Sequence, residues 1–141
     1  FFFFFSWEDS RQMPECSMLP ACAQECAGCH MAYPPGMLPA SSWSRMMKGL
    51  DQHYGTDASL DPAMVRQISV WLEAHAGTYK RVREAPPQDR ITQSAWFERK
   101  HRDIEPAVWK RASIGSRANC MACHTRADQG DFDDDRVRIP K

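Results

Sequence analysis

Two short segments of the 141-residue chain repeat the pattern Cys-X-X-Cys-His, one near each end. The pattern consists of Cys26, Cys29 and His30 in the first copy, and of Cys120, Cys123 and His124 in the second. This is the attachment motif of c-type haem, in which the two thiols add to the vinyl groups of one porphyrin. The adjoining histidine then binds the iron as its proximal ligand. The sequence therefore predicts two covalently bound haems c, called haem 1 and haem 2 below.

Two other uses of a Cys-X-X-Cys pair fit this chain less well. A zinc ribbon usually separates its two cysteine pairs by about 15–20 residues, whereas 90 residues lie between Cys29 and Cys120. Zinc would also leave the two motif histidines unexplained. A thioredoxin-like redox pair belongs to a βαβ unit, and the sequence shows almost no strand pattern. Haem accounts for every residue of both motifs.

Two cysteines, Cys16 and Cys22, are left over once the haems are attached. An even remainder in an oxidising compartment favours a disulfide, which here would close a small loop containing Pro20. Two buried free thiols are the alternative. Because haem is attached to this motif outside the bacterial cytoplasm, the motifs also predict a periplasmic location.

Charge is unevenly distributed along the neutral chain. Residues 1–76 have a net charge of −4, and residues 77–141 have a net charge of +4. Such asymmetry is found on ordinary solvated surfaces, but it also lets a dipolar protein orient on charged redox partners. The basic residues alternate with acidic ones, so we expect no nucleic-acid partner.

No apolar stretch approaches the roughly 18 residues that a membrane-spanning helix requires, so we expect no membrane insertion. The opening run of five phenylalanines, from Phe1 to Phe5, is too short for the apolar core of a signal peptide and carries no argument about the fold. The absence of an initial methionine fits a processed, exported chain.

Local signals around the first motif predict a helix followed by a loop. Pro20 suits the first turn of a helix that runs through residues 20–25 into the motif. Residues 33–39 contain three prolines and a glycine, which prevents regular structure. We expect a carbonyl of this loop to accept the second N–H of His30 and so to fix the imidazole ring.

A second helix is expected to begin after the proline loop, capped by Ser41 or Ser42. Its apolar side chains recur with helical spacing at Trp43, Met46, Met47 and Leu50. His53 continues this stripe and Gly55 interrupts it.

A third helix is expected to start with Asp61 as its N-cap and Pro62 in its first turn, and to stop at Gly77. Its apolar face consists of Met64, Val65, Ile68, Trp71 and Leu72. The pattern therefore predicts an amphipathic helix whose apolar face packs on the first half of the chain.

The second half shows less regular patterning. Residues 77–90 have the composition of a linker. A short helix from about residue 92 to residue 102 would place Phe97 and His101 one turn apart on the same side. Pro106 allows one more brief helix. The acidic tail, residues 128–135, is predicted to be a loop. A small module of this kind depends on its haem for order.

These signals divide the chain into a haem domain at 6–76, a linker at 77–90 and a second c-type haem module at 91–141. Over about residues 15–76 the order of elements resembles a compact class I cytochrome c. That family usually places a distal methionine before its last helix, whereas this chain offers His53. The predicted fold is mainly α: a class I cytochrome c-like N-terminal haem domain followed by a C-terminal haem module with little regular secondary structure.

A second resemblance extends from about residue 22 to residue 140. The segments that carry it are ECAGCHMAYPPGMLP (25–39), DQHYGTDASL (51–60), WFERKHR (96–102) and GSRANCMACHTRADQGDF (115–132). In this order they resemble the dihaem cytochrome c family abbreviated DHC. The resemblance implies a periplasmic electron carrier with bis-histidine haems. It also implies that the electron acceptor is a small oxygen-binding monohaem cytochrome c of the SHP type.

Three histidines remain for the two distal positions on iron. We expect His53 to bind haem 1, because it stands where the class I fold has its distal ligand. We expect His101 to bind haem 2, because it is the only free histidine of the second module. His75 is a rival, although a histidine at the end of a helix is also favoured by the helix dipole.

Methionine is the other candidate for a distal ligand, and Met37, Met46 and Met47 are expected near haem 1. Met46 and Met47 are explained more simply as packing on the helix stripe. The choice affects function, because methionine raises the reduction potential relative to two imidazoles.

The predicted function is electron transfer between redox partners, with the SHP-type cytochrome as acceptor and a b-type membrane cytochrome as candidate donor. With both irons fully ligated, no residue is expected to be catalytic. Two alternatives remain open at this stage. One is a haem enzyme or gas binder with one five-coordinate iron, and the other is a cytochrome subunit of a membrane-associated reductase complex.

Overall fold

The computed structural model describes residues 19–78, 82 and 84–141. Five α-helices occur in these residues: α2 (Pro20–Cys26), α3 (Ala40–Lys48), α4 (Pro62–Ala74), α5 (Ala95–His101) and α6 (Pro106–Trp109). The described segments contain no β-strand, and their one β-bridge joins His53 to Thr56. None of their helices is long and apolar enough to cross a membrane. The prediction of a mainly α protein is confirmed.

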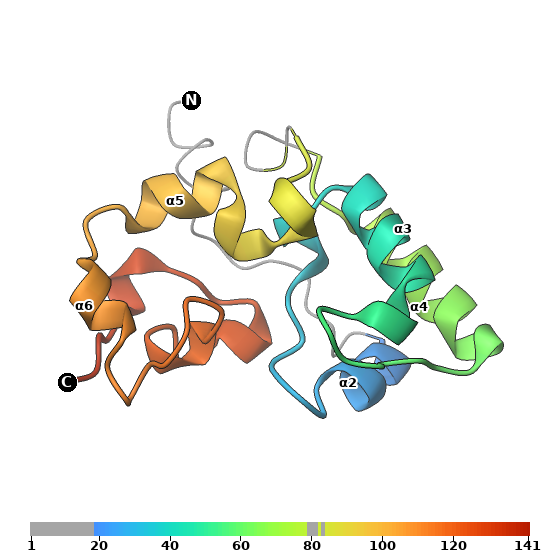
Figure 1. Cartoon of the computed structure of the whole chain (residues 1–141), viewed down its shortest axis with the longest axis horizontal. Helices are drawn as coiled ribbons and strands as arrows, with labels where there is room; N and C mark the ends of the chain where they lie inside the picture. The colour runs from blue at the N-terminus through green and yellow to red at the C-terminus, as the bar shows by residue number, and fades with distance from the viewer. Residues whose placement is uncertain (1–18, 79–81, 83) are drawn as a thin grey trace.

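Helices α2, α3 and α4 lie together in one half of the molecule, and α5, α6 and the C-terminal turns lie in the other (Figure 1). The loop that follows the first motif runs between the two halves. Helix α2 begins at Pro20 and its last residue is Cys26, so the helix leads directly into the first motif, as predicted.

Helix α3 begins one residue earlier than its expected cap. Pro39 is the N-cap, and its carbonyl accepts hydrogen bonds from the backbone N–H groups of Ser42 and Trp43. The prediction of a serine cap was therefore wrong. Ser42 lies inside the helix with no exposed surface, where its hydroxyl donates to Asp89 Oδ1 over 2.7 Å. Ser42 is the third residue of α3, and its hydroxyl takes part in this long-range bond rather than in a cap.

The main core lies between α3 and α4. Ile68 of α4 has no exposed surface, and neither has Leu38, which lies in the loop before α3. Trp43 and Met47 of α3 pack in the same cluster. Asp61 caps α4 by accepting a hydrogen bond from the backbone N–H of Ala63, as predicted. This apolar cluster stabilises the first half, and three of its members, Trp43, Met47 and Leu72, also line a cavity beside it.

Gly77 has a different role from the predicted helix stop. Helix α4 ends at Ala74 with His75 as its C-cap. A Cβ atom on Gly77 would lie 2.5 Å from the backbone oxygen of Gly36, while the Gly77 N–H donates to the Leu38 carbonyl over 2.9 Å. Glycine is thus required because two backbone segments approach each other closely.

The end of the predicted linker is attached to helix α3. Asp89 accepts two hydrogen bonds from Arg45, at 3.0 Å from Nε and 2.8 Å from Nη2, besides the bond from Ser42. Gln88 and Asp89 both have a left-handed backbone conformation, with φ of 57° and 55°. Residues 86–90 therefore follow the surface of the first half closely.

The second half contains little regular secondary structure. Helix α5 is shorter than expected, because Ser94 is extended and caps it by accepting from the Phe97 N–H over 3.1 Å. Helix α6 begins at Pro106, as predicted. Beyond it the described chain forms only 3-10 turns: Cys120–Ala122, Ala127–Gln129 and Asp134–Arg136.

A second apolar cluster joins the two halves. Met37 of the proline loop packs with Ala127 and Phe132 of the C-terminal turns. Ile91 packs against this cluster and also against the main core. The second half therefore takes part of its core from the first.

Candidate haem sites

The first motif faces a cavity of about 430 Å³. Cys26, Cys29 and His30 line one side, and His53 lines it from the segment after α3. Much of the remaining wall is apolar: Trp43, Met46, Met47, Leu50, Leu60 and Leu72. A large apolar cavity with two opposed imidazoles suits a flat apolar macrocycle.

The separation of the two imidazoles provides a test of whether a haem iron fits between them. The ring centroids of His30 and His53 are 6.4 Å apart, and their planes differ by 24°. An imidazole nitrogen binds a metal such as zinc at about 2.0–2.1 Å. The centroid of the ring lies about 1.1 Å behind that nitrogen. Two imidazoles that bind one metal ion from opposite sides therefore have ring centroids about 6.3 Å apart. The observed distance matches a single metal ion bound by both rings.

The hydrogen bond of His30 and the lowered pKa of His53 favour metal binding. Burial lowers the pKa of His53, and the neighbouring His30 adds to the effect. The neutral ring that results is the form that binds a metal. His30 Nδ1 lies 2.6 Å from the Met31 carbonyl, which leaves Nε2 available. The expected acceptor in loop 33–39 was therefore wrong by two residues, because the chain turns directly after the motif.

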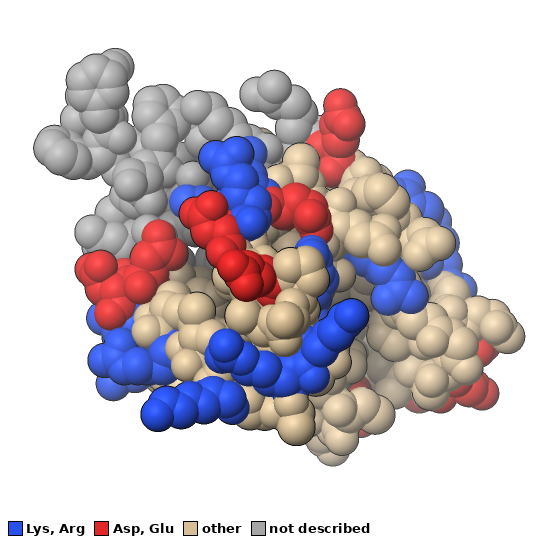
Figure 2. Space-filling view, turned by 60° about the vertical axis from the view of Figure 1, so that its left-hand side comes forward, with Lys and Arg blue, Asp and Glu red and all other residues tan. Residues whose placement is uncertain are grey.

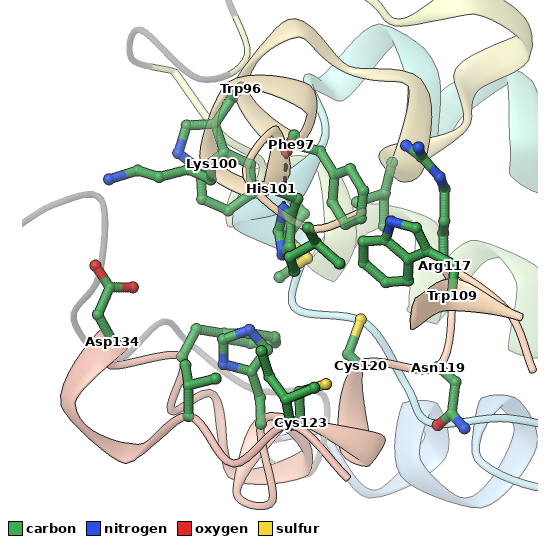
Figure 3. A pocket seen from close by; sticks show the side chains of 17 residues that line it. Trp96, Phe97, Lys100, His101, Trp109, Arg117, Asn119, Cys120, Cys123 and Asp134 are labelled. Carbon is green, nitrogen blue, oxygen red and sulfur yellow. Dashed lines mark hydrogen bonds between the residues drawn. The ribbon is translucent and has the colours of Figure 1, made fainter. Parts of the chain in front are cut away.

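The second motif lines a smaller cavity of about 150 Å³. Cys120, Cys123 and His124 lie on one side and His101 on the other. Figure 3 shows His101 reaching toward the cavity from α5, with Cys120 and Cys123 on the opposite side. The aromatic and aliphatic part of the wall includes Trp96, Phe97, Ile104, Trp109 and Phe132.

The second pair of imidazoles has almost the same separation as the first but a different relative orientation. The centroids of His101 and His124 are 6.3 Å apart, and their planes differ by 80°. His101 Nδ1 donates to the Phe97 carbonyl over 2.8 Å, and its ring stacks on Phe97 at 4.0 Å. These contacts fix the ring and direct its other nitrogen toward His124, as expected of a metal-binding histidine.

Burial also governs the titration of the second site. It lowers the pKa of His101 and of His124, and in the latter the nearby His101 adds to the effect. Burial raises the pKa of the Cys120 thiol to about 11, so before haem attachment this sulfur is protonated at neutral pH. The site therefore holds two neutral imidazoles and a shielded thiol.

The rival histidine lies elsewhere. His75 Nδ1 donates to the Trp71 carbonyl over 2.9 Å, and its ring lies 4.6 Å from that of Trp71. In the part of the chain that the structure describes, it lines neither cavity. Its position corresponds to the helix-end histidine that was the alternative interpretation.

Two of the three candidate methionines lie at the first cavity. Met46 and Met47 line that cavity, where α3 also packs on the core. Met37 lines the second cavity, so its expected place near haem 1 was wrong. The proline loop that carries Met37 packs against the C-terminal turns, and no local sequence signal indicates this contact.

Several residues that line the sites were not predicted. Trp109 and Phe132 border the second cavity, with ring centroids 5.9 Å from His101 and 5.3 Å from His124 respectively. Cys120 and Ile91 line both cavities, so the two sites are neighbours. Only the aromatic character of Trp109 and Phe132 could have suggested such a role.

The two cysteines outside the haem motifs are Cys16 and Cys22. Cys22 is buried and disulfide-bonded, whereas Cys16 lies outside the described residues. The pairing of these two cysteines therefore stays a prediction. No group of three or more His, Cys, Asp and Glu side chains that could hold a bare metal ion is found within the described segments.

Comparison with known proteins identifies related chains. A family model described as dihaem cytochrome c matches residues 22–132. The solved diheme cytochrome c from Rhodobacter sphaeroides is 41% identical, with a TM-score of 0.71, over 80% of this chain and 95% of that one. The diheme cytochrome sb-DHC from Shewanella baltica OS155 is 38% identical, with a TM-score of 0.74, over 84% and 89% respectively. A search of curated proteins finds no match.

Proposed function

The chain belongs to the dihaem cytochrome c family, and from this membership we propose that it is a periplasmic electron carrier with two bis-histidine haems. The family membership itself establishes two covalently bound c-type haems. It also establishes an electron-transfer protein rather than an enzyme.

Each haem is assigned two cysteines and two histidines. Cys26 and Cys29 would attach haem 1, and His30 and His53 would bind its iron. Cys120 and Cys123 would attach haem 2, and His124 and His101 would bind its iron. Bound haem supplies one-electron chemistry, while the side chains set the potential through ligation, hydrogen bonding and burial.

The observation that carries this proposal is the separation of 6.4 Å in one imidazole pair and 6.3 Å in the other. Both distances suit one iron held between two rings, which leaves no open position for a gas or a substrate. Two imidazoles also favour a lower potential than methionine and histidine together. The geometry therefore supports electron transfer over gas binding at both sites.

An acidic partner surface would fit the second half. Exposed basic residues gather at the ends of α5 and α6: Arg99, Lys100, Arg102, Lys110 and Arg111. Figure 2 shows Lys and Arg side chains across the lower part of the face that it draws, and further Lys and Arg side chains above the acidic ones near its centre. Opposite charges speed the encounter of transient partners. We assign the SHP-type monohaem cytochrome as acceptor and a b-type membrane cytochrome as donor.

The ligation is tested by spectra of the purified protein in both oxidation states. We expect two haems per chain, both low-spin when ferric, and no change on adding cyanide to the ferric protein or carbon monoxide to the ferrous protein. A high-spin component, or binding of either ligand, would show an open iron position. Cell fractionation tests the compartment, with recovery of the holoprotein in the periplasmic fraction as the expected result.

A further inference from the structure

Tyr33 connects the first haem site to the segment that carries the second motif. Its ring centroid lies 5.0 Å from that of His30. Its hydroxyl donates a hydrogen bond to the Ala118 carbonyl over 2.8 Å, across 85 positions of sequence. Ala118 precedes Cys120 by two residues, so one side chain links an axial ligand of haem 1 to the attachment segment of haem 2.

The direction of the Tyr33 hydrogen bond is fixed by the chemistry of its partner. A backbone carbonyl oxygen only accepts, so the Tyr33 hydroxyl is the donor. Tyr33, Ala118 and Cys120 all line the first cavity, and Cys120 lines the second as well.

We propose that Tyr33 is a positioning residue for electron transfer between the two haems, holding the segment of Cys120 against His30. The inference rests on the proposed function, because it requires His30 to bind haem 1 and Cys120 to attach haem 2. In the transfer one electron leaves one iron, which is oxidised, and reaches the other, which is reduced. No proton moves and no bond breaks.

Tyr33 would favour transfer between the haems because its contacts run without a break from one site to the other. The rate of electron transfer falls steeply as the distance between two haems grows, so contacts that hold the two sites close together favour it. Other side chains at the contact between the halves, such as Met31, Met37 and Ile91, make apolar contacts. Tyr33 combines a ring contact with an axial imidazole and a hydrogen bond to the other half.

The test replaces Tyr33 by phenylalanine in the full dihaem protein, which removes the hydroxyl and keeps the ring. Tyr54→Phe is the matched control. The Tyr54 ring also lies 5.0 Å from an axial histidine, His53, but its hydroxyl donates to the Gln88 carbonyl over 3.0 Å and not to the second motif. Exchange between haem methyl signals in half-reduced protein, measured by proton NMR, reports electron transfer. Its concentration-independent part is the transfer within one molecule.

We expect Tyr33→Phe to slow this intramolecular exchange severalfold, because the segment of Cys120 loses its hydrogen bond to Tyr33. Both reduction potentials and the low-spin spectra should stay unchanged, and Tyr54→Phe should leave the rate as in the wild type. An unchanged rate in Tyr33→Phe overturns the inference. Equal slowing in both variants, or loss of a haem from Tyr33→Phe, also overturns it, because the hydroxyl would then have a general structural role. A wild-type protein without two low-spin haems would overturn the proposed function as well.

Discussion

The two haem sites differ in how much protein structure surrounds the same ligation geometry. The first lies beside a core of two amphipathic helices, in which Leu38 and Ile68 have no exposed surface. The second lies among short helices and 3-10 turns, and its small core includes Met37 from the other half. Since both imidazole pairs have nearly the same separation, the ligation geometry does not require an extensive helical scaffold.

This comparison predicts different responses to the loss of a haem. We expect Cys120→Ala combined with Cys123→Ala to unfold most of residues 91–141, because that region buries little apolar surface without its cofactor. Cys26→Ala combined with Cys29→Ala should keep much of the signal of α3 and α4. Far-ultraviolet circular dichroism and limited proteolysis measure both effects. A second half that resists protease without haem 2 would contradict the comparison.

Removal of a distal ligand should open only the site to which it belongs. We expect His101→Ala to yield one high-spin haem that binds carbon monoxide when reduced, because no other described histidine faces His124 across that cavity. The His75→Ala protein is the control and should remain entirely low-spin. Optical and electron paramagnetic resonance spectra distinguish the variants. The reverse result would transfer the distal role to His75.

Exchange of the ligand at the first site should change one potential. We expect His53→Met to raise the potential of haem 1 by an appreciable fraction of the roughly 0.8 V range that axial ligands span, because a thioether stabilises ferric iron less than an imidazole does. Haem 2 should change little. Spectroelectrochemical titration measures both potentials. A shift confined to haem 2 would mean that His53 binds haem 2 and not haem 1.

The smallest predicted effect concerns the charges of the two halves. We expect the second-order rate of electron transfer to the acceptor to fall as ionic strength rises, because charges at the edge of an interface act mainly on association. Screening becomes strong when the Debye length falls to about 10 Å, near 0.1 M salt. Stopped-flow measurements over a range of salt concentrations test this. A flat profile would indicate that the opposite charges of the two halves do not guide the encounter.

Local sequence patterns predicted those features that depend on neighbouring residues. The two motifs indicated the cofactors, since the spacing of thiols and histidine is itself the attachment chemistry. Pro20, Asp61 and Pro106 marked helix starts that the structure contains. In each case the signal and the structure lie within a few residues, so tertiary contacts had little to add.

Tertiary structure alone decided what faces each site. Ser42 bonds to Asp89 rather than capping its helix, Met37 lines the second cavity rather than the first, and Tyr33 bonds to Ala118. These contacts join segments that are far apart in the sequence, and their energies depend on close packing that no local pattern encodes. The number of haems and the candidates His53 and His101 were therefore readable from the residues themselves, whereas the fold decided against the rival His75 and set the contact between the two sites.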